Sequence, residues 1–236
     1  MPDHYAEDYS VIMGIVDLLP VALFAVAGCI IIKELFNVLK KPFAVMVCSG
    51  ITLSLTAGTF KAIWKILLSF GVCDFYPFDV MFMPTQSLGF ILMGVGLLSL
   101  LFQKKEKGAA NVKAIAMPLV LILLEGTIVP KENGSIAFIA MLIIGELMIA
   151  TSLSYLAIKN KNWVCLIMFI VSCIALIVMG AMKPLSEKLS MDVATANWVE
   201  ESINIVAQGT LLIGVLLLSK KGFMAFKVPD PRLSQN

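Results

Sequence analysis

The sequence is poor in charged residues and holds a single histidine. Only 14% of its 236 residues are charged, whereas 59% are hydrophobic, a balance far outside the range of soluble domains. Metal-dependent hydrolases need several imidazoles at ligand spacing, so a lone His4 excludes most of that chemistry. Five cysteines occur without a Cys-x-x-Cys pair. We interpret them as small core residues, and we expect neither a metal site nor a cofactor.

Long apolar segments dominate the chain instead. Several carry no charge for most of the roughly 20 residues that a helix needs to cross a bilayer, so they indicate transmembrane helices. The sequence predicts an all-α, polytopic protein of the cell membrane, with one seven-helix transmembrane domain over residues 1–236. The predicted spans are 11–32, 42–70, 77–102, 113–130, 135–158, 162–182 and 196–219.

Lysine and arginine are divided unevenly between the two sets of loops. Thirteen lie in loops 33–41, 103–113 and 159–161 and in the tail from residue 220, against three in the N-terminal segment and the other loops. Because basic loops stay in the cytoplasm, this bias predicts an N-terminus outside and a C-terminus inside.

The order of the spans allows a parallel repeat of three plus one plus three helices. Residues 11–102 and 135–219 would form the two units, and 113–130 the linking helix. "GVGLLS" from Gly94 to Ser99 has a counterpart in "GVLLLS" from Gly214 to Ser219. The arrangement resembles that of SWEET-type sugar transporters and nicotinamide riboside carriers, in which two three-helix units enclose a central site. The resemblance is one of arrangement, because the sequence matches no motif of these families.

Polar side chains gather in the outer halves of the predicted spans. A charge in the bilayer costs about 2.5 to 3.5 kcal/mol on insertion scales, so it needs a partner, water or a function. On the last span, Asn197, Glu201, Asn204 and Gln208 share one face of a helix. This face indicates a polar cavity that reaches from the outer surface towards the middle of the membrane.

Two lysines on the second span need acidic neighbours. Lys61 and Lys65 are four residues apart on one helix and repel each other. The acidic residues expected near them are Asp17, Glu125, Glu146 and Glu201. The predicted ligand-binding residues of the cavity are Lys61, Trp64, Lys65, Gln86, Glu146, Glu201, Asn204 and Gln208, with Glu146 and Glu201 also candidates for proton coupling.

Prolines interrupt three of the predicted spans. Pro20, Pro84 and Pro118 each remove a backbone hydrogen bond, which predicts a kink in the helix. Gln86 follows the second of these prolines closely. We therefore expect its side chain beside a bend, with backbone carbonyls exposed to the cavity.

Mixed charges in such a cavity suit a small polar or zwitterionic solute, and we expect a membrane carrier. One alternative is a seven-helix sensor or receptor for an extracellular ligand, and another is an intramembrane enzyme acting on a lipid. The sequence shows no Ser-His pair, metal cluster or nucleotide motif, so no catalytic residue is assigned. A static ion-pair clasp would explain Lys61 and Glu146 without a ligand. The expected partners are the lipid bilayer, a small-molecule ligand and a second membrane subunit or copy, but not nucleic acid.

Overall fold

The structure, a computed structural model, describes residues 10–35, 39–102 and 134–221. Six stretches in this part of the chain are helical, long and apolar enough to cross a bilayer, which confirms an all-helical integral membrane protein. The predicted span 113–130, with Pro118 and Glu125, lies outside the described residues. The helices are α1 (Val11–Val16), α2 (Leu18–Leu35), α3 (Lys41–Ser69), α4 (Tyr76–Val80), α5 (Phe82–Phe102), α7 (Gly134–Lys159), α8 (Trp163–Gly180), α9 (Met182–Lys188) and α10 (Val193–Lys221).

Polar side chains mark the starts of two long helices. Before α8, Asn162 Oδ1 accepts a hydrogen bond of 3.4 Å from the backbone N–H of Cys165. Before α10, Asp192 Oδ1 accepts one of 2.8 Å from the backbone N–H of Thr195. Hydrogen bonds from Thr195 also lower the pKa of Asp192. These caps satisfy N–H groups that have no partner within the helix, and they fix where each span begins.

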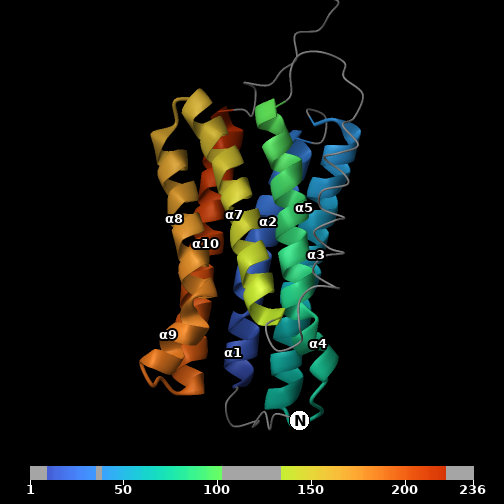
Figure 1. Cartoon of the computed structure of the whole chain (residues 1–236), viewed down its shortest axis with the longest axis vertical. Helices are drawn as coiled ribbons and strands as arrows, with labels where there is room; N and C mark the ends of the chain where they lie inside the picture. Colours follow the sequence, from blue (N-terminus) through green and yellow to red (C-terminus); the bar gives the residue numbers. More distant parts are fainter. Residues whose placement is uncertain (1–9, 36–38, 103–133, 222–236) are drawn as a thin grey trace, which may run out of the picture.

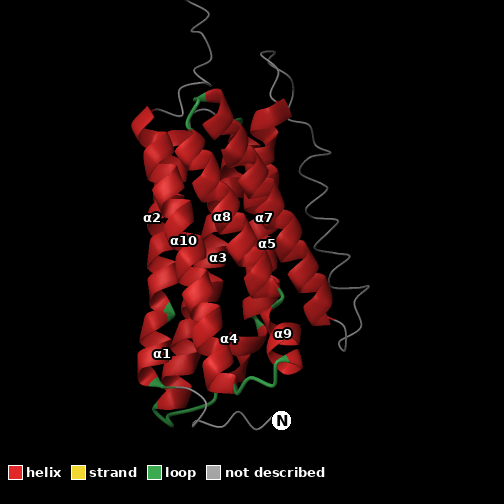
Figure 2. Ribbon diagram, turned by 90° about the vertical axis from the view of Figure 1, so that its left-hand side faces the viewer, coloured by secondary structure: helices red, strands yellow, loops and turns green. Residues whose placement is uncertain are grey.

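The long helices form a closed ring. Contacts run from α2 to α3, α3 to α5, α5 to α7, α7 to α8 and α8 to α10, and α10 returns to α2. The helices lie nearly parallel to the long axis, and the short helices α1, α4 and α9 all lie at the lower end in Figure 1 (see also Figure 2). We call this the short-helix end and the opposite one the sealed end. From the short-helix end, α2, α5, α7 and α10 run upwards, whereas α3 and α8 run downwards.

Three spans in the described residues are broken at the short-helix end. Each break separates a short helix from a long one by a single residue, and a proline follows three positions later. A proline has no N–H for the carbonyl four residues before it, and its ring crowds that carbonyl, so the helix opens there. The break residues and their prolines are Asp17 with Pro20, Met81 with Pro84, and Ala181 with Pro184.

Apolar side chains fill the ring towards the sealed end. Leu35 of α2, Leu156 of α7 and Leu218 of α10 belong to one buried cluster, and none of them has exposed surface. At the same end, Ser219 Oγ donates a hydrogen bond of 2.9 Å to Glu34 Oε1, which joins α10 to α2. Burial of this apolar surface closes the interior of the ring on this side.

Two glycines permit very close packing of α5 against its neighbours. A Cβ atom on Gly50 of α3 would lie 2.5 Å from the carbonyl oxygen of Gly89. A Cβ atom on Gly145 of α7 would lie 2.6 Å from the carbonyl carbon of Phe90. Any side chain at either position would therefore force two helix backbones apart.

We expect Gly50→Leu to lower the free energy of unfolding by about 1–3 kcal/mol, the usual cost of an overpacked core. The new side chain has to displace α5 backbone rather than a flexible side chain. Thermal unfolding of the purified protein in detergent measures the loss. The matched control is Gly209→Leu on α10, because nothing lies within 4 Å of a Cβ atom there. Equal losses in the two variants would contradict close packing as the cause.

Candidate functional site

A cavity of about 480 Å³ lies inside the ring near the short-helix end. All six long helices and α4 contribute to its lining. Phe24 of α2 and Phe90 of α5 form part of its wall and also belong to the apolar cluster, with ring centroids 6.0 Å apart. They separate the cavity from the sealed end. Its volume falls within the range of about 300–1,000 Å³ that is usual for small-molecule sites.

One lysine at the cavity wall lies between two carboxylates. Lys65 Nζ is 2.6 Å from Asp17 Oδ2 and 3.3 Å from Glu201 Oε1. The side chains of Lys65 and Asp17 are only 4% and 5% exposed, and that of Glu201 is 13% exposed. We call these three residues the Lys65 cluster. It joins α3, the break between α1 and α2, and α10, and such pairing allows charges to be buried.

The second lysine of α3 has a different partner. Lys61 forms an ion pair with Asp79 of α4, and both side chains are about a quarter exposed, at 25% and 22%. The ring of Trp64 lies behind this lysine, with its centroid 4.5 Å from Lys61 Nζ. Trp64 Nε1 in turn donates a hydrogen bond of 2.8 Å to Asp74 Oδ1. Trp64 therefore holds Lys61 in place without reaching the cavity itself.

Several oxygen atoms at the cavity wall have no hydrogen-bond partner among the described residues, whereas the amide nitrogens of Gln208 and Asn197 are already used. Gln208 Nε2 donates to Asn204 Oδ1 at 3.4 Å, and Asn197 Nδ2 donates to the carbonyl of Val193 at 3.0 Å. An unpaired buried acceptor costs free energy, so the wall is suited to a ligand that donates hydrogen bonds. The unpartnered atoms are Asp17 Oδ1, Ser54 Oγ, Gln86 Oε1, Glu201 Oε2 and Gln208 Oε1.

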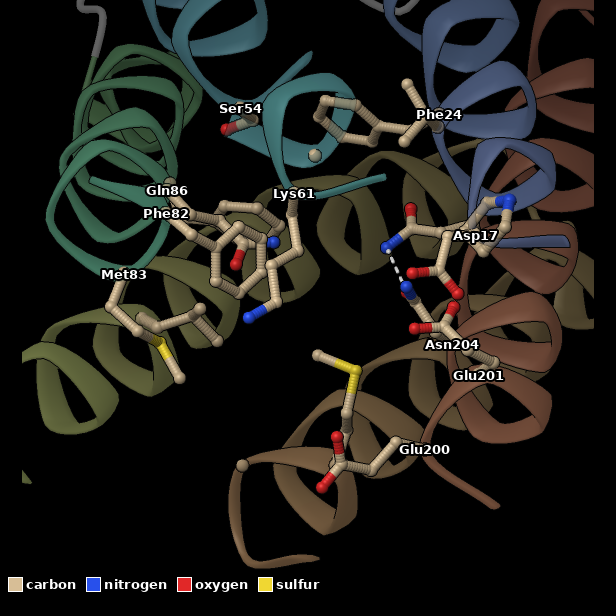
Figure 3. A pocket seen from close by; sticks show the side chains of 18 of the residues that line it. Asp17, Phe24, Ser54, Lys61, Phe82, Met83, Gln86, Glu200, Glu201 and Asn204 are labelled. Atoms are coloured by element: carbon tan, nitrogen blue, oxygen red, sulfur yellow. Dashed lines mark hydrogen bonds between the residues drawn. The ribbon is translucent and has the colours of Figure 1, made fainter. Parts of the chain in front are cut away.

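The two sides of the cavity are visible in Figure 3. Lys61, Phe82 and Gln86 lie on one side, and Asp17, Glu201 and Asn204 lie on the other. Glu200 stands apart from both groups. A solute between the two sides would touch polar groups from α3 and α5 and from α10 at the same time.

The structure brings six of the eight predicted ligand-binding residues to the cavity and leaves two outside its lining. Trp64 is buried behind Lys61, and Glu146 is buried in α7 with only 3% of its surface exposed. Glu146 has no ion-pair partner among the described residues, and both lysines pair with other carboxylates. The six predicted residues that do line the cavity are Lys61, Lys65, Gln86, Glu201, Asn204 and Gln208.

Some lining residues could not be singled out from the sequence. Asp79 lies only three residues into the predicted span 77–102, so its predicted depth is much smaller than that of Lys61, and depth alone did not suggest the pair. Glu200 is about 100° from the polar face of its helix, yet it also lines the cavity. The aromatic wall gave no signal, because phenylalanines in apolar spans face cores and cavities alike. It consists of Phe24, Phe82, Phe90 and Phe138.

Comparisons of the chain with protein families, with curated proteins and with solved structures find no match. In the part of the chain that the structure describes, no three His, Cys, Asp or Glu side chains are grouped so that they could hold a metal ion. What the cavity offers is a set of charges and hydrogen-bond acceptors suited to binding a small polar molecule.

Proposed function

We propose that the protein is a carrier that binds a small polar solute in this cavity and moves it across the membrane. The observation that supports the proposal best is the polar cavity within the ring, which apolar side chains close on one side only. Carriers bind their solutes near the middle of the bilayer and expose the site to one side at a time. A site closed towards one end of the helices is the arrangement expected of one of these two states.

The sidedness follows from the positive-inside bias. The basic residues at the ends of α2, α3 and α7, namely Lys33, Lys41 and Lys159, lie at the sealed end, whereas the described loops 70–75 and 189–192 at the short-helix end carry none. We therefore assign the sealed end to the cytoplasm and the short-helix end to the outside. In this orientation the cavity faces outwards, and the N-terminal side of α1 lies outside.

The ring also supports a division into two units of three helices. α2, α3 and α5 form the first unit, and α7, α8 and α10 form the second, so the units meet where α5 contacts α7 and where α2 contacts α10. Among the described residues, a polar contact crosses between the units at each end. Lys65 meets Glu201 near the cavity, and Glu34 meets Ser219 at the sealed end. Rocking of one unit against the other would break and remake these contacts in turn.

We expect the double substitution Lys61→Met with Glu201→Gln to abolish solute exchange while leaving the net charge unchanged. It removes one charged group from each side of the cavity, so the pattern of charges that a solute meets is changed on both sides. The measurement is counterflow in proteoliposomes that are preloaded with an unlabelled mixture of amino acids, polyols and amines and then offered each labelled compound in turn.

The matched control is Lys188→Met with Glu187→Gln. Both residues are exposed on α9 at the same end and do not line the cavity. Equal uptake by the wild type and the cavity variant would contradict the assigned site. Binding of a solute without any exchange would favour the receptor alternative over the carrier.

A further inference from the structure

We propose that the cavity selects an organic cation with N–H donors, such as a primary ammonium group on a small apolar body. This inference rests on the proposed function only for the movement of the cation across the membrane. The binding preference itself is a property of the cavity and can be measured separately.

The charges that line the cavity do not balance. Among the described residues, four carboxylates and two ammonium groups line it, which gives a formal excess of two negative charges. Within the described part of the chain, Glu200 has no ion-pair partner, and two carboxylates share Lys65. A cation that enters reduces this excess, whereas an anion increases it. The four carboxylates belong to Asp17, Asp79, Glu200 and Glu201.

The two lysines are poorly placed to bind an anionic group. Lys65 is almost fully buried and already contacts two carboxylates, and Lys61 is paired with Asp79. An anionic ligand would have to displace one of these carboxylates and leave it unpaired in a buried place, which costs several kcal/mol. The lysines therefore reduce the negative charge of the wall without creating an anion site.

The neutral polar atoms of the wall also favour a hydrogen-bond donor. Gln208 and Ser54 are only 5% and 6% exposed, and Gln208 Oε1 and Ser54 Oγ have no partner among the described residues. At two helix breaks, the carbonyls of Val80 and Gly180 receive no hydrogen bond from the residue four positions later, because that residue is Pro84 or Pro184. Val80 and Gly180 both line the cavity. An ammonium group has three N–H donors and no acceptor, so it matches this wall.

Aromatic rings supply the apolar part of the wall. A cation is attracted to the face of an aromatic ring within about 6 Å of its centroid. The structure holds one example at this wall, since Lys61 Nζ lies 5.6 Å from the ring centroid of Phe82. Phe24, Phe90 and Phe138 line the same cavity. An organic cation can use these rings and the carboxylates together, whereas a bare metal ion would need a cluster of ligands.

The test compares four probes that share a phenyl ring and differ in the charge of the head group. They are 2-phenylethylammonium, 2-phenylethanol, 3-phenylpropanoate and the zwitterion phenylalanine. Binding to the full-length protein in nanodiscs is measured by isothermal titration calorimetry. We expect the ammonium probe to bind at least about tenfold more tightly than each of the others.

The variant Glu200→Gln removes the carboxylate that has no ion pair. We expect it to weaken binding of the ammonium probe about tenfold and to leave binding of the alcohol unchanged. Glu187→Gln makes the same chemical change at an exposed position of α9 outside the cavity and serves as the control. Equal weakening by both variants would overturn the assignment of the cation to this cavity.

The outcomes separate this inference from the carrier proposal. If the alcohol, the carboxylate or the zwitterion binds as tightly as the ammonium probe, or if the ammonium probe does not bind, the cation preference is overturned. Saturable counterflow of another solute would then still support a carrier. If the ammonium probe binds selectively but proteoliposomes do not exchange it, the cation preference stands and the carrier proposal fails.

Discussion

Replacement of Lys65 by methionine is expected to destabilise the protein by about 3–5 kcal/mol, the usual cost of removing one partner from a buried ion pair. The variant leaves the carboxylates of Asp17 and Glu201 facing each other without the ammonium group between them. The side chain of Asp17 is only 5% exposed, so water replaces the lost partner poorly. Thermal unfolding in detergent, followed by size-exclusion chromatography, measures the loss.

A triple variant without charges tests whether the unpaired buried carboxylates cause the loss of stability in Lys65→Met. Asp17→Asn, Lys65→Met and Glu201→Gln together remove all three charges of the Lys65 cluster. We expect this variant to recover much of the lost stability, because replacement of a whole buried ion pair is often close to neutral. Lys188→Met, at an exposed position, is the control for loss of a lysine. If the single variant Lys65→Met unfolds at the same temperature as the wild type, the Lys65 cluster does not hold the helices together.

A tryptophan placed in the cavity is expected to abolish solute binding while the protein stays folded. In Asn204→Trp, the indole would project from α10 into the space between Glu201 and Lys61, and the loss of affinity should reach about hundredfold, or about 2.7 kcal/mol. The binding of 2-phenylethylammonium to the variant in nanodiscs measures the effect. Asn204 is partly exposed at the cavity wall, so the fold should tolerate the larger ring.

The matched control for this substitution lies almost at the same depth on the same helix. Val206 is 51% exposed on the outer face of α10, so Val206→Trp adds the same ring without filling the cavity. We expect wild-type binding from this control. Retained binding in Asn204→Trp, with an unchanged unfolding temperature in both variants, would show that the solute site lies elsewhere.

The sequence predicted the spans well because a bilayer imposes a length and a composition on each helix. The predicted span 42–70 corresponds to α3, Lys41–Ser69, and the predicted span 162–182 to α8, Trp163–Gly180. The polar face of α10 was also predictable, since helical periodicity fixes which residues of one helix share a side. The breaks after Val16 and Val80 were expected as bends from Pro20 and Pro84.

The partners of the lysines were harder to predict. The position of a residue along a predicted span gives its depth, and helical periodicity gives the face on which it lies. Neither shows which helix lies opposite that face. Glu146 and Lys61 have similar predicted depths, yet α7 does not bring Glu146 to the cavity lining, and the short helix α4 supplies Asp79 to Lys61 instead. Trp64 stands next to Lys65 in the sequence, but a step of about 100° per residue turns it away from the cavity.

The three helix breaks divide the walls of the cavity into two kinds. α1, α4 and α9 are only six, five and seven residues long, and helices this short have little stability of their own. Of the three, α4 contributes Asp79 and Val80 to the cavity wall, so this part of the mouth can readjust at low cost, whereas the floor belongs to long helices packed into the apolar core. Such a site would be strict about the chemical group that reaches the floor and tolerant of the size and shape of whatever remains at the mouth.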